Sequence, residues 1–308
     1  MDSKEQLNEL MEEAQQIKQK YFGDDINFYY TGDYFPALSV TGPRCSLNCK
    51  HCNRILIERL TPVLEPRKLV EECMRLDARG ATGVLITGGC DLEGRVPLDN
   101  YLDAIREIKN ETNLVLIAHT GLIDYEAARD LRKSGVEGVC VDVVGSEKVT
   151  AEIYGVPFKP MDYINTLKSL ERARLDNISP HICVGLFYGK LSHEFKALDI
   201  VSVIKPSNVV IIGLMNLDGS MMEDVRIKAA DVGRVLAQAR IKYQKTFISL
   251  GCARGKGEVR AKIDEYACEA GVNNIALPTP RAYVKARELG LKINEYKSCC
   301  SVLPSRLG

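Results

Sequence analysis

The sequence predicts an α/β protein built as a complete (β/α)8 TIM barrel. Eight apolar runs of strand length recur along the chain, each followed by a glycine or polar turn and then a helical stretch. Nearly continuous apolar strands that alternate with helices are typical of parallel strands buried on both faces. Eight such units can close into a barrel. The predicted strands occupy residues 35–42, 83–89, 114–121, 138–145, 181–186, 208–216, 246–252 and 274–278.

Length and continuity favour a single barrel. The chain has 308 residues and a mass of 34.2 kDa, a length that α/β barrels reach as one domain. No low-complexity linker interrupts it. We therefore expect an N-terminal helical extension over 1–34, the barrel over 35–290 and a C-terminal tail over 291–308. An open doubly wound sheet, or a six-unit partial barrel with a C-terminal appendage, is the alternative.

The chain begins with an amphipathic helix over residues 4–20. Apolar side chains recur there at helical spacing with charges on the other face, so the helix should pack against one end of the barrel. The apolar positions are Leu7, Leu10, Met11, Ala14 and Ile17.

Charge and cysteine content limit the classes of function. Lys plus Arg and Asp plus Glu each number 41, which does not indicate nucleic-acid binding. The N-terminus is too charged for a signal peptide, and no apolar run reaches the ~18 residues that a membrane span needs. We therefore expect a cytoplasmic protein. Its eleven cysteines are too many to explain as disulfides in that compartment, so some should bind metal.

The strongest motif follows the first predicted strand. Cys45, Cys49 and Cys52 form a C-x3-C-x2-C run on a loop that begins with Gly42 and Pro43. Zinc would need a fourth ligand at similarly short range, and no Cys or His follows at such a spacing. A zinc loop, or three unrelated buried thiols, is the alternative. Three cysteines would leave one iron of a cubane iron-sulfur cluster without a protein ligand.

This loop resembles the signature of the radical S-adenosylmethionine (SAM) enzymes, whose spare iron chelates SAM. The resemblance implies a 4Fe-4S cluster on the three cysteines, with SAM bound beside it. His51 lies where the family usually has an aromatic residue near the adenine, so we expect it to pack or stack there.

Two further strands carry positions that the resemblance assigns to SAM. Thr87, Gly88 and Gly89 end the second strand, where the family has a Gly-Gly-Glu stretch that binds the SAM amino group; here Cys90 replaces the acid. The glycines should expose backbone to the ligand. Asp142 ends the fourth strand and needs a partner, either the ribose hydroxyls of SAM or a basic residue of a neighbouring helix.

A second group of thiols is predicted from the C-terminal half. Cys252 follows the seventh strand, and Cys299 and Cys300 lie in the tail. If the tail folds over the barrel mouth, these three could hold a second cluster. Cys90 and Ser301 are candidates for a further ligand. Cys183 is another, because its strand resembles the fifth strand of biotin synthase, where a cysteine holds a sulfur-donating cluster; the alternative is an ordinary buried core cysteine. The alternative is a flexible tail with incidental thiols, and we expect His119, at the end of the third strand, to be a satisfied core group.

Over residues 35–300 the chain resembles the biotin-synthase-like radical SAM enzymes. The closer resemblance is to a group that includes two-component lipoyl synthases, through the segments F-P-A-L-S-V-T-G, G-C-A-R and the terminal C-C-S. The third-strand cysteine of biotin synthase is absent. The resemblance implies sulfur insertion into a protein-bound octanoyl chain. The implied partners are an octanoylated carrier (a lipoyl domain or H protein) and a companion radical SAM component.

Two alternatives to lipoyl synthesis stay open from the sequence. One is a radical SAM enzyme of the same family with other chemistry, of the biotin-synthase, methylornithine-synthase or hydrogenase-maturase type. The other is a non-catalytic iron-sulfur carrier. No catalytic side chain is assigned, because the cofactors carry the difficult chemistry in such enzymes.

Overall fold

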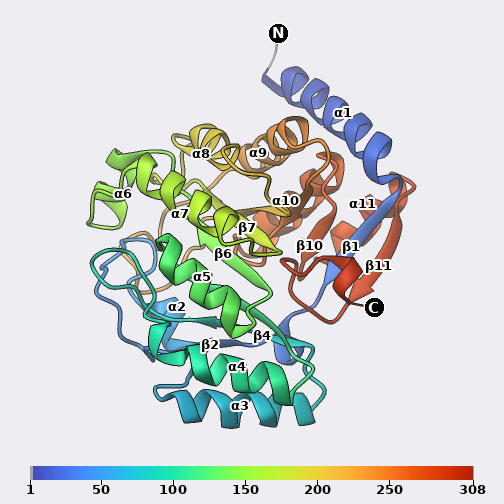
Figure 1. Ribbon diagram of the computed structural model, residues 1–308. Coiled ribbons are helices and arrows are strands. Elements are labelled where there is room, and N and C mark those ends of the chain that lie inside the picture. Colours follow the sequence, from blue (N-terminus) through green and yellow to red (C-terminus); the bar gives the residue numbers. More distant parts are fainter. Residues whose placement is uncertain (1–2, 308) are drawn as a thin grey trace.

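The computed structural model describes residues 3–307 and contains one curved, parallel sheet with helices around its outer face (Figure 1). Its strands are β1 (Asp25–Tyr29), β2 (Ala37–Ser39), β3 (Thr61–Pro62), β4 (Gly83–Thr87), β5 (Val115–His119), β6 (Gly138–Asp142), β7 (Ile178–Val184), β8 (Asn208–Gly213), β9 (Phe247–Leu250), β10 (Asn274–Ala276) and β11 (Lys292–Tyr296). Their order in the sheet is β11-β1-β10-β9-β8-β7-β6-β5-β4-β2-β3. All eight predicted strands are present, each beside the next.

The prediction of a complete barrel is wrong, because the sheet does not close. Closure would pair β2 with β10, but β1 occupies the second edge of β10 and β3 the second edge of β2. Within residues 3–307, no ladder joins the edge strands β3 and β11. β2 and β3 have only three and two residues, so this edge offers few hydrogen bonds. The sheet is therefore a partial barrel.

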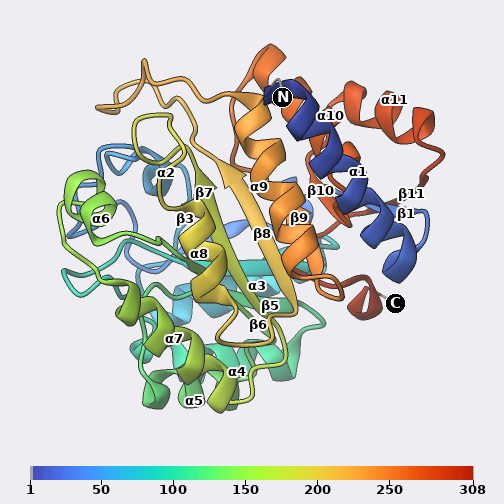
Figure 2. The ribbon, with the colours of Figure 1, turned by 90° about the horizontal axis from the view of Figure 1, so that it is seen from above.

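The helices cover the convex face of the sheet (Figure 2). They are α1 (Ser3–Phe22), α2 (Ile55–Glu58), α3 (Pro66–Ala78), α4 (Leu102–Glu111), α5 (Tyr125–Ser134), α6 (Glu147–Ile153), α7 (Pro160–Arg172), α8 (Glu194–Val201), α9 (Ala229–Lys242), α10 (Gly257–Glu269) and α11 (Pro280–Glu288). Local signals set several ends: the Asp124 carboxylate accepts a hydrogen bond from the Ala127 N–H at the start of α5, and Gly135, with φ of 98°, ends it.

The amphipathic N-terminal helix is present, but it packs on other helices rather than at an end of the sheet. α1 lies against α9 and α10. Gly233 of α9 permits this approach, because a Cβ there would lie 2.7 Å from the Met11 methyl group. The segment that follows α1 forms β1 within the same sheet, so residues 1–34 are not only helical.

The C-terminal tail enters the concave interior from the end where the strands begin, so its predicted position over the barrel mouth is wrong. A buried polar layer holds it there. Asn27 donates to Asn274 and Asn274 to Ser249, both at 2.9 Å. Ser249 donates to Asn208 at 2.8 Å, and Asn208 donates to the Cys300 carbonyl at 3.0 Å. Because these donors lie near the strand starts, the tail backbone is fixed at that end.

None of the helices in the described part of the chain is both long enough and apolar enough to span a membrane.

Candidate functional site

The cysteine loop lies at the end of the sheet where the strands finish. It follows β2 directly, and its backbone is tied to two neighbouring elements. The Ser46 N–H donates to the Cys90 carbonyl at 2.7 Å, beyond β4, and the Lys50 N–H donates to the Ile153 carbonyl at 2.8 Å, at the end of α6. Residues 53 and 54 both have positive φ, 45° and 65°, and such strained backbone concentrates at functional sites.

The buried thiols of this loop do not readily lose their protons to become thiolates unless a cation is bound beside them. Burial raises the pKa of Cys49, and the nearby Cys52, Cys45, Cys90 and Asp142 raise it further. Burial also raises the pKa of Cys52. Iron binds the thiolate form and displaces the proton. A cationic cluster would therefore relieve the mutual repulsion of these side chains, and the donor set fits one.

A zinc site would need its ligand sulfurs close together. Four ligands about 2.3 Å from one zinc lie only about 3.8 Å apart. Among residues 3–307 no three Cys, His, Asp or Glu side chains are gathered for one metal ion. The iron-sulfur and zinc interpretations of the loop both stay predictions.

The Gly-Gly turn after β4 supports the cysteine loop by close packing. A Cβ on Gly89 would lie 2.1 Å from the Arg44 carbonyl oxygen and 2.6 Å from the Cys45 Cα. The Gly89 N–H donates to the Thr41 hydroxyl at 2.7 Å, so that donor is already used within the protein. Thr87 is buried at the end of β4. The assignment of Thr87, Gly88 and Gly89 to SAM stays a prediction.

Gly89→Ala should therefore displace the cysteine loop. Backbone atoms stand in the way of the new methyl group and cannot rotate aside, so we expect a loss of about 1–3 kcal/mol of stability. Iron bound at the first site should fall with it. Iron analysis and urea unfolding would check both effects. Gly255→Ala is the matched control, because its Cβ would meet only a Val259 methyl at 3.3 Å; equal losses in both variants would contradict this account.

His51 has an unpaired polar atom beside the cysteines. Its ring centroid lies 5.6 Å from that of Tyr154, and its buried Nδ1 has no hydrogen-bond partner among the described residues. Burial lowers the pKa of His51 to about 4, so the ring is neutral at pH 7. Such a group could pair with a polar atom of a bound ligand. The place of His51 beside SAM stays a prediction.

A polar layer lies beneath the cysteine loop on three neighbouring strands. The Asp142 carboxylate of β6 is 3.5 Å from the His119 Nε2 of β5, and Asp142 is in register with His181 of β7. The polar side chain nearest to the Asp142 carboxylate is thus a strand histidine and not the helix residue considered from the sequence. The buried His119 Nε2 has no hydrogen bond, so the expectation of a satisfied core histidine is wrong. Burial lowers the pKa of His181 to about 4.

Two thiols of the predicted second group, Cys299 and Cys300, lie together inside the sheet, and the third, Cys252, follows the end of β9. The Cys299 sulfur accepts hydrogen bonds from the Cys300 thiol and from the Ser301 N–H, the latter at 3.5 Å, and these lower the pKa of Cys299 to about 7. Its hydrogen bond to Cys299, burial and the nearby Cys252 raise the pKa of Cys300. The surrounding protein, and then the nearby Cys299, raise the pKa of Cys252. Part of the Cys252 residue is nevertheless exposed to solvent. The tail is buried here rather than flexible.

The three candidate additional ligands lie in different places. Cys90 belongs beside the first group, since its carbonyl accepts a hydrogen bond from the Cys45 thiol at 3.7 Å. Burial is the main cause that raises the pKa of Cys183, and the nearby Asp142 and Glu194 raise it further. Cys183 therefore lies near the layer formed by Asp142 and the two histidines. Only Ser301 lies beside the tail thiols.

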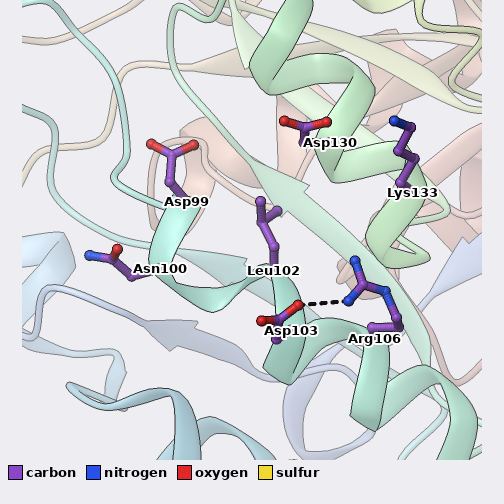
Figure 3. Close-up of a pocket in the computed structure, with 7 residues that line it drawn as sticks. All are labelled: Asp99, Asn100, Leu102, Asp103, Arg106, Asp130 and Lys133. Atoms are coloured by element: carbon purple, nitrogen blue, oxygen red, sulfur yellow. Dashed lines mark hydrogen bonds and ion pairs between the residues drawn. The ribbon is translucent and has the colours of Figure 1, made fainter.

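A surface hollow on the outer face of the helices is remote from this chemistry (Figure 3). It is lined by residues of α4, α5 and the turn before α4, and the Arg106 guanidinium pairs with the Asp103 carboxylate along α4 at 2.6 Å. It contains no thiol or histidine. The concave interior of the sheet is therefore the candidate site.

Comparisons with known proteins agree with this location. A protein-family model described as the Radical SAM superfamily matches residues 39–193. The biotin synthase of Campylobacter hominis is 26% identical over 285 residues, which cover 87% of this chain and 81% of that protein.

Two solved structures share the fold. Methylornithine synthase superposes with a TM-score of 0.68 at 17% identity, covering 96% of this chain and 91% of that chain. The FeFe-hydrogenase maturase from Carboxydothermus hydrogenoformans superposes with a TM-score of 0.70 at 17% identity, covering 96% and 73%. At these identities the two structures indicate the fold alone. The family model spans just over half of the chain and includes the whole cysteine loop, and the protein therefore belongs to the radical SAM superfamily.

Proposed function

We propose that this protein is a radical SAM sulfur-insertion enzyme of the biotin-synthase-like type, acting on an octanoyl chain attached to a carrier-protein lysine. One observation carries the proposal: the chain has two separate groups of thiols, one in the loop after β2 and one in the tail that lies inside the sheet. Cys45, Cys49 and Cys52 lie where the strands finish. Cys299 and Cys300 lie next to the layer of asparagine and serine side chains near the strand starts, with Cys252 close to them.

A substrate could be held between the two groups. A five-residue strand spans roughly 13 Å, which bounds the depth of the interior. Asp142, His119 and His181 occupy the intermediate level. A substrate carbon placed there would face the SAM site above and a sulfur source below.

The chain's own residues have distinct proposed roles. Cys45, Cys49 and Cys52 would hold a 4Fe-4S cluster, and His51, Thr87 and Asp142 would orient SAM beside it. Cys252, Cys299 and Cys300 would hold the second cluster. When bound, these cofactors would supply reductive SAM cleavage and sulfur.

Apolar side chains of the interior would exclude water from the reacting carbon. Those that pack with the tail residues Cys300 and Val302 are Phe35, Ile117, Val210 and Ala276.

Similarity to biotin synthases supports a second candidate of the same chemistry. In that case the acceptor would be a free precursor of biotin instead of a carrier-bound chain. That the partners are a carrier protein and a companion radical SAM component is proposed from the sequence resemblance to lipoyl synthases. The second thiol group lies outside the segment matched by the family model, so it distinguishes this chain from a generic member of the superfamily.

Cys299→Ala and Cys300→Ala should separate sulfur insertion from SAM cleavage. We expect each variant to lose one cluster's worth of iron, about four atoms for a cubane. SAM cleavage with dithionite should persist, because the first site is intact. Mass spectrometry of an octanoylated carrier, with and without a companion enzyme, should find sulfur in the wild-type reaction only. A parallel incubation with a biotin precursor separates the two acceptors. Unchanged iron in both variants would remove the sulfur-insertion proposal.

A further inference from the structure

One buried thiol next to the tail has no role in the function proposed above. Cys140 is the third residue of β6, and only 4% of it is exposed. It is in register with His119 of β5, one level below Asp142. It packs in an interior cluster with Ile117 and Val302, against which Cys299 also lies.

Ser301 connects this thiol to the tail cysteines. The Cys140 Sγ lies 3.5 Å from the Ser301 Oγ, and the Ser301 N–H lies 3.5 Å from the Cys299 Sγ. The two sulfurs therefore flank one residue. The Ser301 carbonyl accepts a hydrogen bond from Asn177, which fixes this residue against the start of β7. The arrangement does not depend on a flexible tail.

The surroundings of Cys140 suit an iron ligand. Its buried sulfur lies beside Ser301, and its side chain packs in the same cluster as Cys299. A buried set of thiols that repel one another as thiolates is stabilised by a cation of high charge. Thiolate is also a softer and better ligand for iron-sulfur clusters than a serine hydroxyl.

We propose that Cys140 is a ligand of the second iron-sulfur cluster, completing a four-cysteine site with Cys252, Cys299 and Cys300. The proposal rests on the proposed function of the interior thiols and goes beyond it by naming the fourth ligand. Of the sequence candidates, Cys90 lies with the first site and Cys183 nearer the Asp142 layer. Ser301 is close enough to compete, and the test must separate it from Cys140.

The test counts iron and sulfide in anaerobically reconstituted protein. Wild type should hold about eight irons if both clusters are cubanes. Cys140→Ala should lose between one iron and one whole cluster, with a changed electron paramagnetic resonance spectrum after dithionite reduction. Ser301→Ala should keep the wild-type count and spectrum. Cys73→Ala removes an equally buried thiol from the core of α3 and should change neither, which controls for general damage to the fold.

A second background isolates the interior site. With Cys45, Cys49 and Cys52 all replaced by alanine, the remaining iron belongs to the second cluster alone, and adding Cys140→Ala should reduce it by a quarter or more. Full retention of iron and spectrum on adding Cys140→Ala would overturn the assignment, and so would a loss caused by Ser301→Ala instead. If the triple variant is folded by circular dichroism yet binds no iron, the second cluster itself fails, and with it the sulfur-insertion proposal.

Discussion

Replacing any one of Cys45, Cys49 or Cys52 by alanine should lower reductive SAM cleavage by at least roughly a thousandfold, equivalent to ~4 kcal/mol of barrier. The loss should be this large because the protein contributes positioning while the cluster supplies the reducing chemistry. Without one thiolate, iron at this site should fall by one cluster. Formation of 5'-deoxyadenosine and methionine in the presence of dithionite, measured by mass spectrometry, reports the rate without any need to know the substrate.

The matched control is again Cys73→Ala, which removes a fully buried thiol from a helix. It should keep the wild-type rate of SAM cleavage at a small cost in stability. If Cys49→Ala cleaved SAM at the wild-type rate, the first cluster would have to be held elsewhere. Zinc in anaerobically purified protein, with no iron, would point to the same conclusion.

Most of the fold could be predicted because local apolar patterning reports burial on both faces. All eight predicted runs contain a strand, and the cysteine loop follows β2 as expected. The run at 181–186 was set too late, since β7 begins at Ile178 and includes Pro180, a residue that rarely occurs in central strands. β11 has no apolar run to reveal it, because three of the five residues in K-I-N-E-Y are polar and none of the five is buried, as suits a strand at the edge of a sheet.

Closure of the sheet could not be read from the strands themselves. β2 could pair with β10 only if the second edge of β10 were free. β1 occupies that edge instead, in a parallel ladder that places Asn27 opposite Asn274. That pairing joins residues almost a whole chain apart. The same long-range contact begins the polar layer that holds the tail, so the tail's entry from the strand starts was equally hidden.

The candidate site was predictable where residues are close in sequence and not where the fold brings them together. The C-x3-C-x2-C spacing pointed to one loop. Period-two alternation placed Cys140 and Asp142 on one face, yet gave no reason to connect Cys140 with a tail more than 150 residues away. His119 was misjudged because a missing hydrogen bond is a property of the packed interior, which has no signal in sequence.

Arg254→Ala should destabilise the protein by about 3–5 kcal/mol, as expected when one partner of a buried ion pair is removed. Arg254 and Asp264 have fully buried side chains, and Arg254 Nε donates to the Asp264 carboxylate at 2.8 Å. The same guanidinium donates to the carbonyls of Gly251 at 2.7 Å and Ala276 at 2.8 Å. It therefore joins the ends of β9 and β10 to α10. Urea unfolding of the purified protein would measure the loss.

An exposed ion pair gives the contrast for this prediction. Arg281 pairs with Glu258 at 2.5 Å, and their side chains are 44% and 74% exposed. Arg281→Ala should cost less than about 1 kcal/mol. The double variant Arg254→Met with Asp264→Leu should regain much of the stability lost by Arg254→Ala, since it leaves no unpaired buried charge. Because Arg254 follows Cys252 by two residues, a loss no greater than that of Arg281→Ala would mean that this ion pair does not hold the Cys252 turn in place.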